Sequence, residues 1–149
     1  MKPQIVLITE SWLKPHISSN VIQISSYNII RSDRINSRGG GIIAYTSPHL
    51  NIDVILQSND PEIIFFNVKS SNSAFAASII LIYSPPPANT SSEEIIVKHI
   101  NTKFDSLLDK MILCGDLNKP NYSPELIDFN CPLFELFLPE SHSKSHQTL

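Results

Sequence analysis

The sequence is poor in cysteine and has no excess of basic residues. Its 149 residues include only two cysteines, Cys114 and Cys131, which disfavours a disulfide framework or a cysteine-rich zinc site and predicts two reduced thiols. Eleven Lys and Arg face fourteen Asp and Glu, so the formal net charge is -3. A protein that holds nucleic acid through bulk positive charge is therefore disfavoured, whereas a local basic patch stays compatible with this balance.

Long hydrophobic runs are also missing. The longest nearly apolar stretch, Ala74 to Tyr83, is too short for a helix that spans a bilayer, and Met1 to Thr9 lacks the apolar core and cleavage site of a signal peptide. We therefore expect no membrane association and an intracellular protein, nuclear or cytoplasmic, that is not secreted. The chain length favours a single domain with one core.

Runs of β-branched and aromatic residues predict a chain dominated by strands. Gln4 to Thr9 and Met111 to Cys114 are short continuous apolar runs, which is the pattern of strands buried on both faces. Turn-forming residues separate five further predicted strands: Val21–Ser25, Gly41–Thr46, Asn51–Gln57, Glu62–Lys69 and Ala74–Tyr83. The polar residues within the Asn51 and Glu62 strands favour an antiparallel meander with one face less buried.

Helical signals are confined to the second half of the chain. Ser91 or Ser92 can cap a helix that ends near Lys110, because Ile96, Ile100, Phe104 and Leu107 recur at helical spacing. A short helix is also predicted around Leu133 to Leu138. Between the strand that ends at Tyr83 and the first helix, three consecutive prolines, Pro85 to Pro87, predict a rigid extended loop suited to line a site.

Carboxylates follow two of the apolar strands, at the point where each strand ends. Glu10 lies in Ile-Thr-Glu-Ser, and Asp116 lies in Gly-Asp-Leu-Asn. A carboxylate at the end of a buried strand is held at the rim of a sheet, where metal and phosphate sites are assembled. Other interpretations stay open at this point: Glu10 as an ordinary strand-end carboxylate, Asp116 and Asn118 as an Asx turn, and Trp12 as a packed aromatic.

All three arginines lie in one loop. Arg31, Arg34 and Arg38 belong to Arg-Ser-Asp-Arg-Ile-Asn-Ser-Arg, which runs directly into the glycines 39–41. No Gly-Lys-Ser/Thr follows, so the glycine run is not a phosphate-binding P-loop and is interpreted as backbone geometry before a strand. The loop fits two roles equally well, a contact with DNA or a solvated turn in which Asp33 pairs with one of the first two arginines.

Four motifs follow one another along the chain. Lys2 to Leu13 reads Lys-Pro-Gln-Ile-Val-Leu-Ile-Thr-Glu-Ser-Trp-Leu, and Tyr27 precedes an Arg-x-Asp-Arg element and the glycine run. Tyr83 opens Tyr-x-Pro-Pro, and Gly115 opens Gly-Asp-Leu-Asn. In this order and spacing the motifs resemble the endonuclease/exonuclease/phosphatase superfamily, most closely the endonuclease domains of non-LTR retrotransposons, over about residues 2–138.

The resemblance implies a fold and a domain assignment. The expected architecture is an α/β fold with two packed, mainly antiparallel β-sheets flanked by helices, a four-layer α/β sandwich. Residues 1–138 are assigned to this domain in incomplete form, and residues 139–149 to a polar C-terminal tail.

The resemblance also implies a metal-dependent phosphodiesterase-type endonuclease that hydrolyses the DNA backbone, with Mg2+ as the cofactor and Mn2+ as an alternative. Glu10 is then the metal ligand, Asp116 orients or deprotonates the attacking water, and Asn118 hydrogen-bonds the scissile phosphate. Tyr83 resembles the active-site tyrosine of the family. The alternative interpretation is that Tyr83 caps a strand in the core. The residues expected to contact the DNA backbone are Arg31, Arg34 and Arg38.

The sequence departs from the family pattern at both ends. The first strand of the family delivers an asparagine to the metal and phosphate site, and it has no counterpart before the Lys-Pro-Gln-Ile stretch. The family closes with an aspartate-bearing strand and a Ser-Asp-His element, whereas this chain ends with Ser-His-Ser-Lys-Ser-His. The catalytic histidine is therefore assigned to neither His142 nor His146. We expect a domain truncated at both ends, with weak or no catalysis.

Two other functions stay open. A non-catalytic retroelement remnant would bind nucleic acid or a protein partner through the arginine loop and exposed sheet edges. The missing proton-handling residues favour this alternative, and the acidic net charge opposes tight DNA binding. A branch of the superfamily that acts on phosphoinositides or small phosphoesters is the third, and the Arg-x-Asp-Arg and Tyr-x-Pro-Pro elements point away from it.

Overall fold

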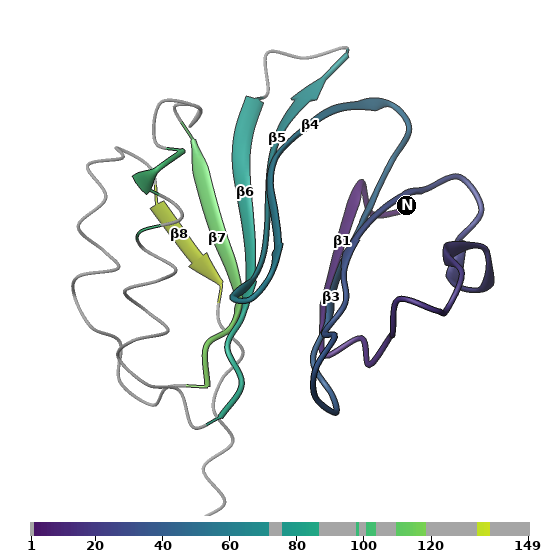
Figure 1. Cartoon of the computed structure of the whole chain (residues 1–149). Helices are drawn as coiled ribbons and strands as arrows, with labels where there is room; N and C mark the ends of the chain where they lie inside the picture. The colour runs from purple at the N-terminus through teal and green to yellow at the C-terminus, as the bar shows by residue number, and fades with distance from the viewer. Residues whose placement is uncertain are drawn as a thin grey trace, which may run out of the picture.

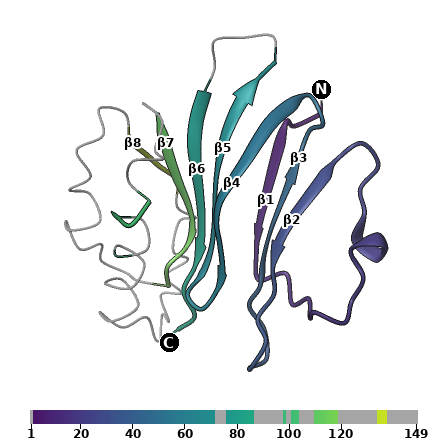
Figure 2. The same ribbon diagram turned by 45° about the horizontal axis from the view of Figure 1, so that its top comes forward.

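The described part of the chain forms two β-sheets. A computed structural model describes residues 2–71, 76–86, 98, 101–103 and 110–118, together with the backbone of 134–137. The smaller sheet is antiparallel and has the strand order β1-β3-β2 (Figure 1 and Figure 2). Its strands are β1 (Ile5–Thr9), β2 (Asn28–Ser32) and β3 (Ile42–Thr46).

The larger sheet has the order β4-β5-β6-β7-β8. Strands β4, β5 and β6 pair antiparallel as a meander, and β7 and β8 add in parallel orientation. The bounds are β4 (Leu50–Asn59), β5 (Glu62–Ser70), β6 (Ala76–Tyr83), β7 (Met111–Asp116) and β8 (Phe134–Phe137). The predicted meander is therefore confirmed, and its third strand leads by a crossover to the parallel strand that carries Asp116.

The core lies between the two sheets. Ile42 and Ala44 of β3 pack in one cluster with the inward residues of β5 and β6, including Phe66 and Leu81. Side chains two residues apart share a sheet face, and this alternation brings Tyr83, at the end of β6, into the same cluster. The face-to-face packing of two mainly antiparallel sheets confirms the central part of the predicted sandwich.

Strands β5 and β6 are buried on both faces. Residues of the alternate set, such as Phe65 and Ile80, are fully buried although they point away from the core between the sheets. The expectation that the β5 region has a less buried face is therefore wrong, because Asn67 is also buried and accepts a hydrogen bond from Ser78 Oγ. Strand β4 does alternate between exposed and half-buried residues, as predicted.

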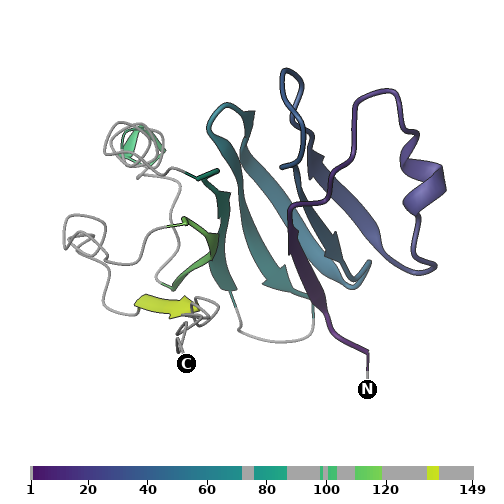
Figure 3. The same cartoon turned by 90° about the horizontal axis from the view of Figure 1, so that it is seen from below.

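The predicted strand Val21–Ser25 is wrong. The structure has a 3-10 helix there, η1 (Ser19–Ile22), which lies beyond the small sheet in Figure 3. Ser18 caps it by accepting a hydrogen bond from the Asn20 N–H, and Val21 is 77% exposed, so no sheet packs against this β-branched side chain. Strand β2, with Ile29 and Ile30 flanked by polar residues, was not predicted.

Two further expectations are wrong. The β1 run is not buried on both faces, because β1 is an edge strand of the small sheet and Ile8 is 36% exposed. The region around Leu133 to Leu138 forms strand β8 rather than a short helix. Its Phe-Glu-Leu-Phe sequence suits a strand as well as a helix, and parallel pairing with β7 decides between them.

The predicted helix between Ser92 and Lys110 lies mostly outside the described residues. Within it, the Thr102 N–H donates to the Lys98 carbonyl at 3.0 Å, which is the i to i−4 bond of a helical turn. The flanking helices of the expected four-layer sandwich are not part of what the structure describes, and the same holds for the predicted domain boundary at residue 138. None of the helices in the described ranges is long and apolar enough for a membrane crossing.

The thiol of Cys114 is free, as predicted, and Cys131 lies outside the described residues. Cys114 lies on β7 and its Sγ contacts the Ile80 carbonyl oxygen at 3.5 Å. Burial raises the pKa of this thiol to about 12. We infer that Cys114 fills space between strands and has no nucleophilic role at neutral pH.

Candidate active site

Glu10 and Tyr83 meet where the ends of the two sheets come together. Glu10 directly follows β1, and its Oε1 accepts a hydrogen bond from the hydroxyl of Tyr83, the last residue of β6. The second carboxylate oxygen, Oε2, accepts from the Trp12 indole N–H at 3.3 Å. This hydrogen bond joins two residues that are 73 positions apart in the sequence, at the end of the sandwich where both strands finish.

These contacts set the protonation of the pair. The Tyr83 hydroxyl, followed by the Trp12 indole N–H, holds the pKa of the Glu10 carboxyl below its ordinary value, so Glu10 is ionised at neutral pH. Burial, assisted by the neighbouring Glu10 carboxylate, raises the pKa of the Tyr83 phenol. Tyr83 therefore stays protonated and acts as a hydrogen-bond donor.

The glycine run fixes the segment that carries Glu10. The Ser11 N–H donates to the Gly41 carbonyl at 2.9 Å, and the Trp12 N–H donates to the Gly40 carbonyl at 2.8 Å. Gly40 has a φ of +67, and a Cβ there would lie 2.4 Å from Arg34 Cζ, so a larger residue would strain the backbone and push the Arg34 side chain aside. The run is backbone geometry, as predicted, and it also anchors the Glu10 loop.

Asp116 and Asn118 lie beside Tyr83. In the parallel pairing of β6 and β7, Asp116 is the register partner of Tyr83, and the Ser84 N–H donates to the Asp116 carbonyl at 2.9 Å. Asp116 Oδ1 accepts from the Asn118 N–H at 2.8 Å, and Asn118 Nδ2 donates to the Ser84 carbonyl at 2.7 Å. The Asx turn considered from the sequence is present, and it also holds both side chains next to Tyr83.

An ion pair not predicted from the sequence lies behind Tyr83. Glu62, the first residue of β5 and the register partner of Tyr83, is only 3% exposed. It accepts from Arg34 Nε at 2.5 Å and from the Gly41 N–H at 2.8 Å. Burial raises the pKa of the Glu62 carboxyl, and these two donors oppose the shift. The only sequence signal was a charge at the head of an apolar strand.

The three arginines have different surroundings. The Arg31 guanidinium pairs with Asp33 and also donates to the Ile17 carbonyl at 2.8 Å and to the Lys14 carbonyl at 3.0 Å. Arg34 lies over the Tyr83 ring, with 5.3 Å from Cζ to the ring centroid. Arg38 lies over the Trp12 ring at 5.5 Å.

Trp12 is exposed, not packed. Its side chain is 52% accessible to solvent, and therefore its interpretation as a packed aromatic is wrong. Because it follows Glu10 and carries Arg38 on one face, it adds an aromatic surface and a positive charge to the rim of the site. A stacking role for this residue is consistent with that position.

The donor chemistry of the site fits a hard divalent cation held by few protein ligands. The described residues contain no group of three or more His, Cys, Asp and Glu side chains that could hold a metal. Mg2+ keeps several waters and needs only one or two carboxylates, which an exposed and ionised Glu10 can supply. The described residues therefore suit a hydrated ion held at Glu10.

Two solved structures are similar to this chain. The human Nocturnin catalytic domain with bound sulfate matches 82% of the chain with a TM-score of 0.51 and 16% identity, and TDP2 from D. rerio with a single-stranded DNA product matches 84% with a TM-score of 0.51 and 15% identity. At these identities the likeness shows a shared fold and nothing finer.

The chain spans about half the length of each of these proteins, 52% of the Nocturnin domain and 51% of TDP2. No family model and no curated protein matches its sequence.

Proposed function

We propose that this chain carries a metal-binding and phosphate-facing site of a phosphodiesterase that hydrolyses the DNA backbone, of the retrotransposon endonuclease type. The observation that carries the proposal is the meeting of an ionised Glu10, a protonated Tyr83 and the Asp116–Asn118 turn where the strand ends of the two sheets come together. Both solved neighbours share the fold, and one of them was solved with a DNA product.

Each residue has a role that follows from its surroundings. Glu10 would hold Mg2+, with Mn2+ as the alternative, and the bound ion would neutralise phosphate oxygens. Asp116 takes the proton of the attacking water while the water oxygen bonds to phosphorus; the P–O bond to the leaving sugar oxygen breaks, and that oxygen takes a proton from solvent. Asn118 Nδ2 has a second N–H beyond the one given to the Ser84 carbonyl, and it donates to a phosphate oxygen.

A second candidate function is binding of nucleic acid or a protein partner without catalysis. Arg38 over the exposed Trp12 favours it, because a cation and an aromatic face together hold single-stranded nucleic acid without chemistry at Glu10. Arg34 and Arg31 are also proposed to contact DNA. Fewer of their N–H groups can reach a phosphate, because the guanidinium groups already pair with Glu62 and Asp33. This function predicts binding that survives loss of Glu10.

Nicking of supercoiled plasmid tests the enzymatic proposal. After circular dichroism shows a folded chain, we expect slow nicking that requires Mg2+ or Mn2+ and falls about a hundredfold in Glu10→Ala and in Asp116→Ala. Asp53→Ala, an exposed aspartate on β4, is the matched control and keeps the wild-type rate. A folded chain that never nicks would rule out hydrolysis and leave the binding function.

A further inference from the structure

The segment that carries Glu10 has an unusual backbone. Glu10 has a φ of 53° and Trp12 a φ of 58°, both in the left-handed region that residues other than glycine rarely adopt. Backbone of this kind persists only where neighbouring groups hold it. The contacts of residues 10–14 therefore decide where the Glu10 carboxylate and the Trp12 ring point.

Lys14 joins this segment to a neighbouring loop through its side chain. Its Nζ donates to the Arg34 carbonyl at 3.0 Å and to the Ser37 carbonyl at 2.5 Å. Both carbonyls belong to the β2–β3 loop (residues 33–41), whose glycine carbonyls already accept from two backbone N–H groups of the segment. Bonds donated by an ammonium are charge-assisted and stronger than those between neutral groups. Lys14 thus ties the end of the segment to the same loop that its beginning contacts.

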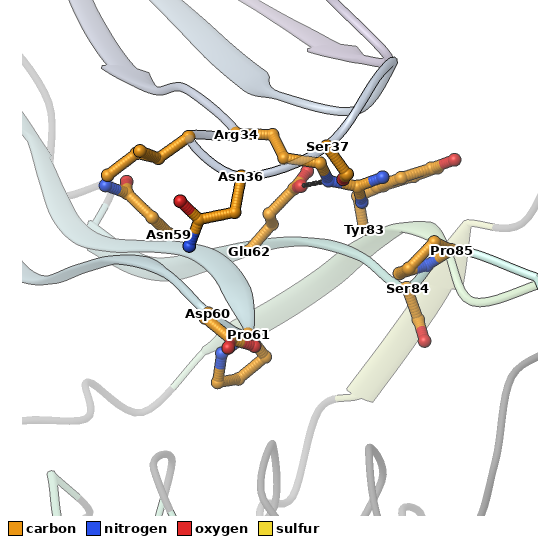
Figure 4. A pocket seen from close by; sticks show the side chains of 11 residues that line it. Arg34, Asn36, Ser37, Asn59, Asp60, Pro61, Glu62, Tyr83, Ser84 and Pro85 are labelled. Carbon is orange, nitrogen blue, oxygen red and sulfur yellow. Dashed lines mark hydrogen bonds and ion pairs between the residues drawn. The ribbon is translucent and has the colours of Figure 1, made fainter. Parts of the chain in front are cut away.

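The β2–β3 loop is itself fixed to the large sheet. The Arg34 side chain forms an ion pair with Glu62, the first residue of β5, and the Gly41 N–H donates to the same carboxylate at 2.8 Å. Figure 4 shows Arg34 and Ser37 among the residues that line a pocket beside Tyr83, with a dashed line between Arg34 and Glu62. The carbonyls that accept from the ammonium therefore belong to a loop that is anchored to β5.

A lysine four residues beyond a candidate metal ligand could instead contact the DNA backbone. Two of the three Nζ–H groups of Lys14 are already used by protein carbonyls, and the side chain is half-buried. From the other side, the Arg31 guanidinium donates to the Lys14 carbonyl at 3.0 Å. A residue held at both its side chain and its backbone suits a structural link better than a phosphate contact.

We propose that Lys14 is a positioning residue for the candidate metal site. By linking the Glu10 segment to the β2–β3 loop, it keeps the Glu10 carboxylate against the Tyr83 hydroxyl. It also keeps Trp12 beside Arg38. Lys14 touches neither the metal nor the substrate in this role. The inference rests on the proposed function, because the metal bound at Glu10 is what the positioning serves.

Mn2+ affinity tests this role, because position and charge predict opposite signs. Removal of a positive charge near Glu10 would, by electrostatics alone, tighten the binding of a divalent cation. If Lys14 positions the ligand, Lys14→Met instead weakens Mn2+ binding about tenfold. Lys69→Met, at an exposed lysine near the opposite end of β5 from Glu62, is the matched control and keeps the wild-type affinity. Where the wild type binds Mn2+, tighter or unchanged binding by Lys14→Met would overturn the inference.

A second measurement needs no metal. Trp12 is the only tryptophan of the chain, so its fluorescence anisotropy reports the motion of the Glu10 segment. We expect lower anisotropy in Lys14→Met than in the wild type or Lys69→Met, in samples that circular dichroism and urea unfolding show to be equally folded. Lys14→Gln replaces Lys14→Met, with the same expected loss, if the methionine variant does not fold.

The two measurements distinguish failure of the inference from failure of the proposed function. No Mn2+ binding by the folded wild type would overturn the proposed function, whereas lower anisotropy in Lys14→Met would still show that Lys14 positions the segment. Unchanged anisotropy in a folded Lys14 variant would overturn the inference even where Mn2+ binds at Glu10.

Discussion

Gly115→Ala is expected to lower the free energy of unfolding by about 4 kcal/mol, the largest stability effect of any substitution considered for this chain. Gly115 has a φ of +139, which side-chain-bearing residues rarely adopt. An added Cβ would lie 1.8 Å from the carbonyl oxygen of Ile82, its register partner on β6. Because this neighbour is backbone, β7 would have to separate from β6, and the pairing of Tyr83 with Asp116 would be lost.

Gly39→Ala is the matched control for this effect. Gly39 also has a positive φ, +75, yet an added Cβ would meet nothing closer than 3.8 Å. The substitution should therefore cost only the backbone strain, about 1 kcal/mol. Urea unfolding followed by circular dichroism measures both variants, and equal losses would contradict the proposed clash at Gly115.

Glu62→Ala is expected to lower the free energy of unfolding by about 3 kcal/mol. The substitution leaves the Arg34 guanidinium, only 15% exposed, without its anion and removes the acceptor of the Gly41 N–H. Since the Gly40 and Gly41 carbonyls also hold the segment after Glu10, nicking should fall as well. Denaturant unfolding and the plasmid assay on the same preparation measure the two effects.

A double variant distinguishes charge from packing at this position. Removing both charges, with Arg34→Met and Glu62→Met together, leaves no unpaired charge, and stability should recover by more than half of the loss in Glu62→Ala. The cation over the Tyr83 ring is absent in this variant, so nicking should stay low. A double variant as unstable as Glu62→Ala would show that the pair matters through shape and not through charge.

The residues of the candidate site could be predicted from the sequence, whereas the ion pair between Arg34 and Glu62 could not. Glu10 and Asp116 each follow a short apolar strand, and the motif order then linked them to Tyr83 and Asn118. The structure brings these four residues together at one end of the sandwich through contacts between distant parts of the sequence. Glu62 gave no such signal, because a single charge before an apolar strand does not reveal that register places it opposite Tyr83.

The errors in secondary structure have one physical cause. Val21 and Phe134 lie in segments with similar strand propensity, yet η1 has no partner strand and β8 pairs with the edge of β7. Strand formation depends on a neighbouring strand and on burial, which local sequence does not encode. The β-branched Val21 therefore lies in a 3-10 helix exposed to solvent, and the strand β2 forms where Ile29 and Ile30 pair with β3.

The role of Glu10 distinguishes the two proposed functions, a metal-dependent enzyme and a non-catalytic remnant that binds a partner. Its carboxylate has two hydrogen bonds from protein, so a purely structural role is chemically complete without any metal. Its exposure and lowered pKa are what a hydrated divalent cation needs. Metal binding at Glu10 is accordingly the central claim, and it can be tested without relying on catalysis.

The most direct test is a titration of the folded chain with Mn2+, followed by electron paramagnetic resonance of the free ion. The account predicts one saturable site in the wild-type chain, at least a tenfold loss of affinity in Glu10→Gln, and no change in Asp53→Asn on the exposed face of β4. Equal Mn2+ binding by wild type and Glu10→Gln, or no binding by either, would contradict the account and leave Glu10 as a structural carboxylate.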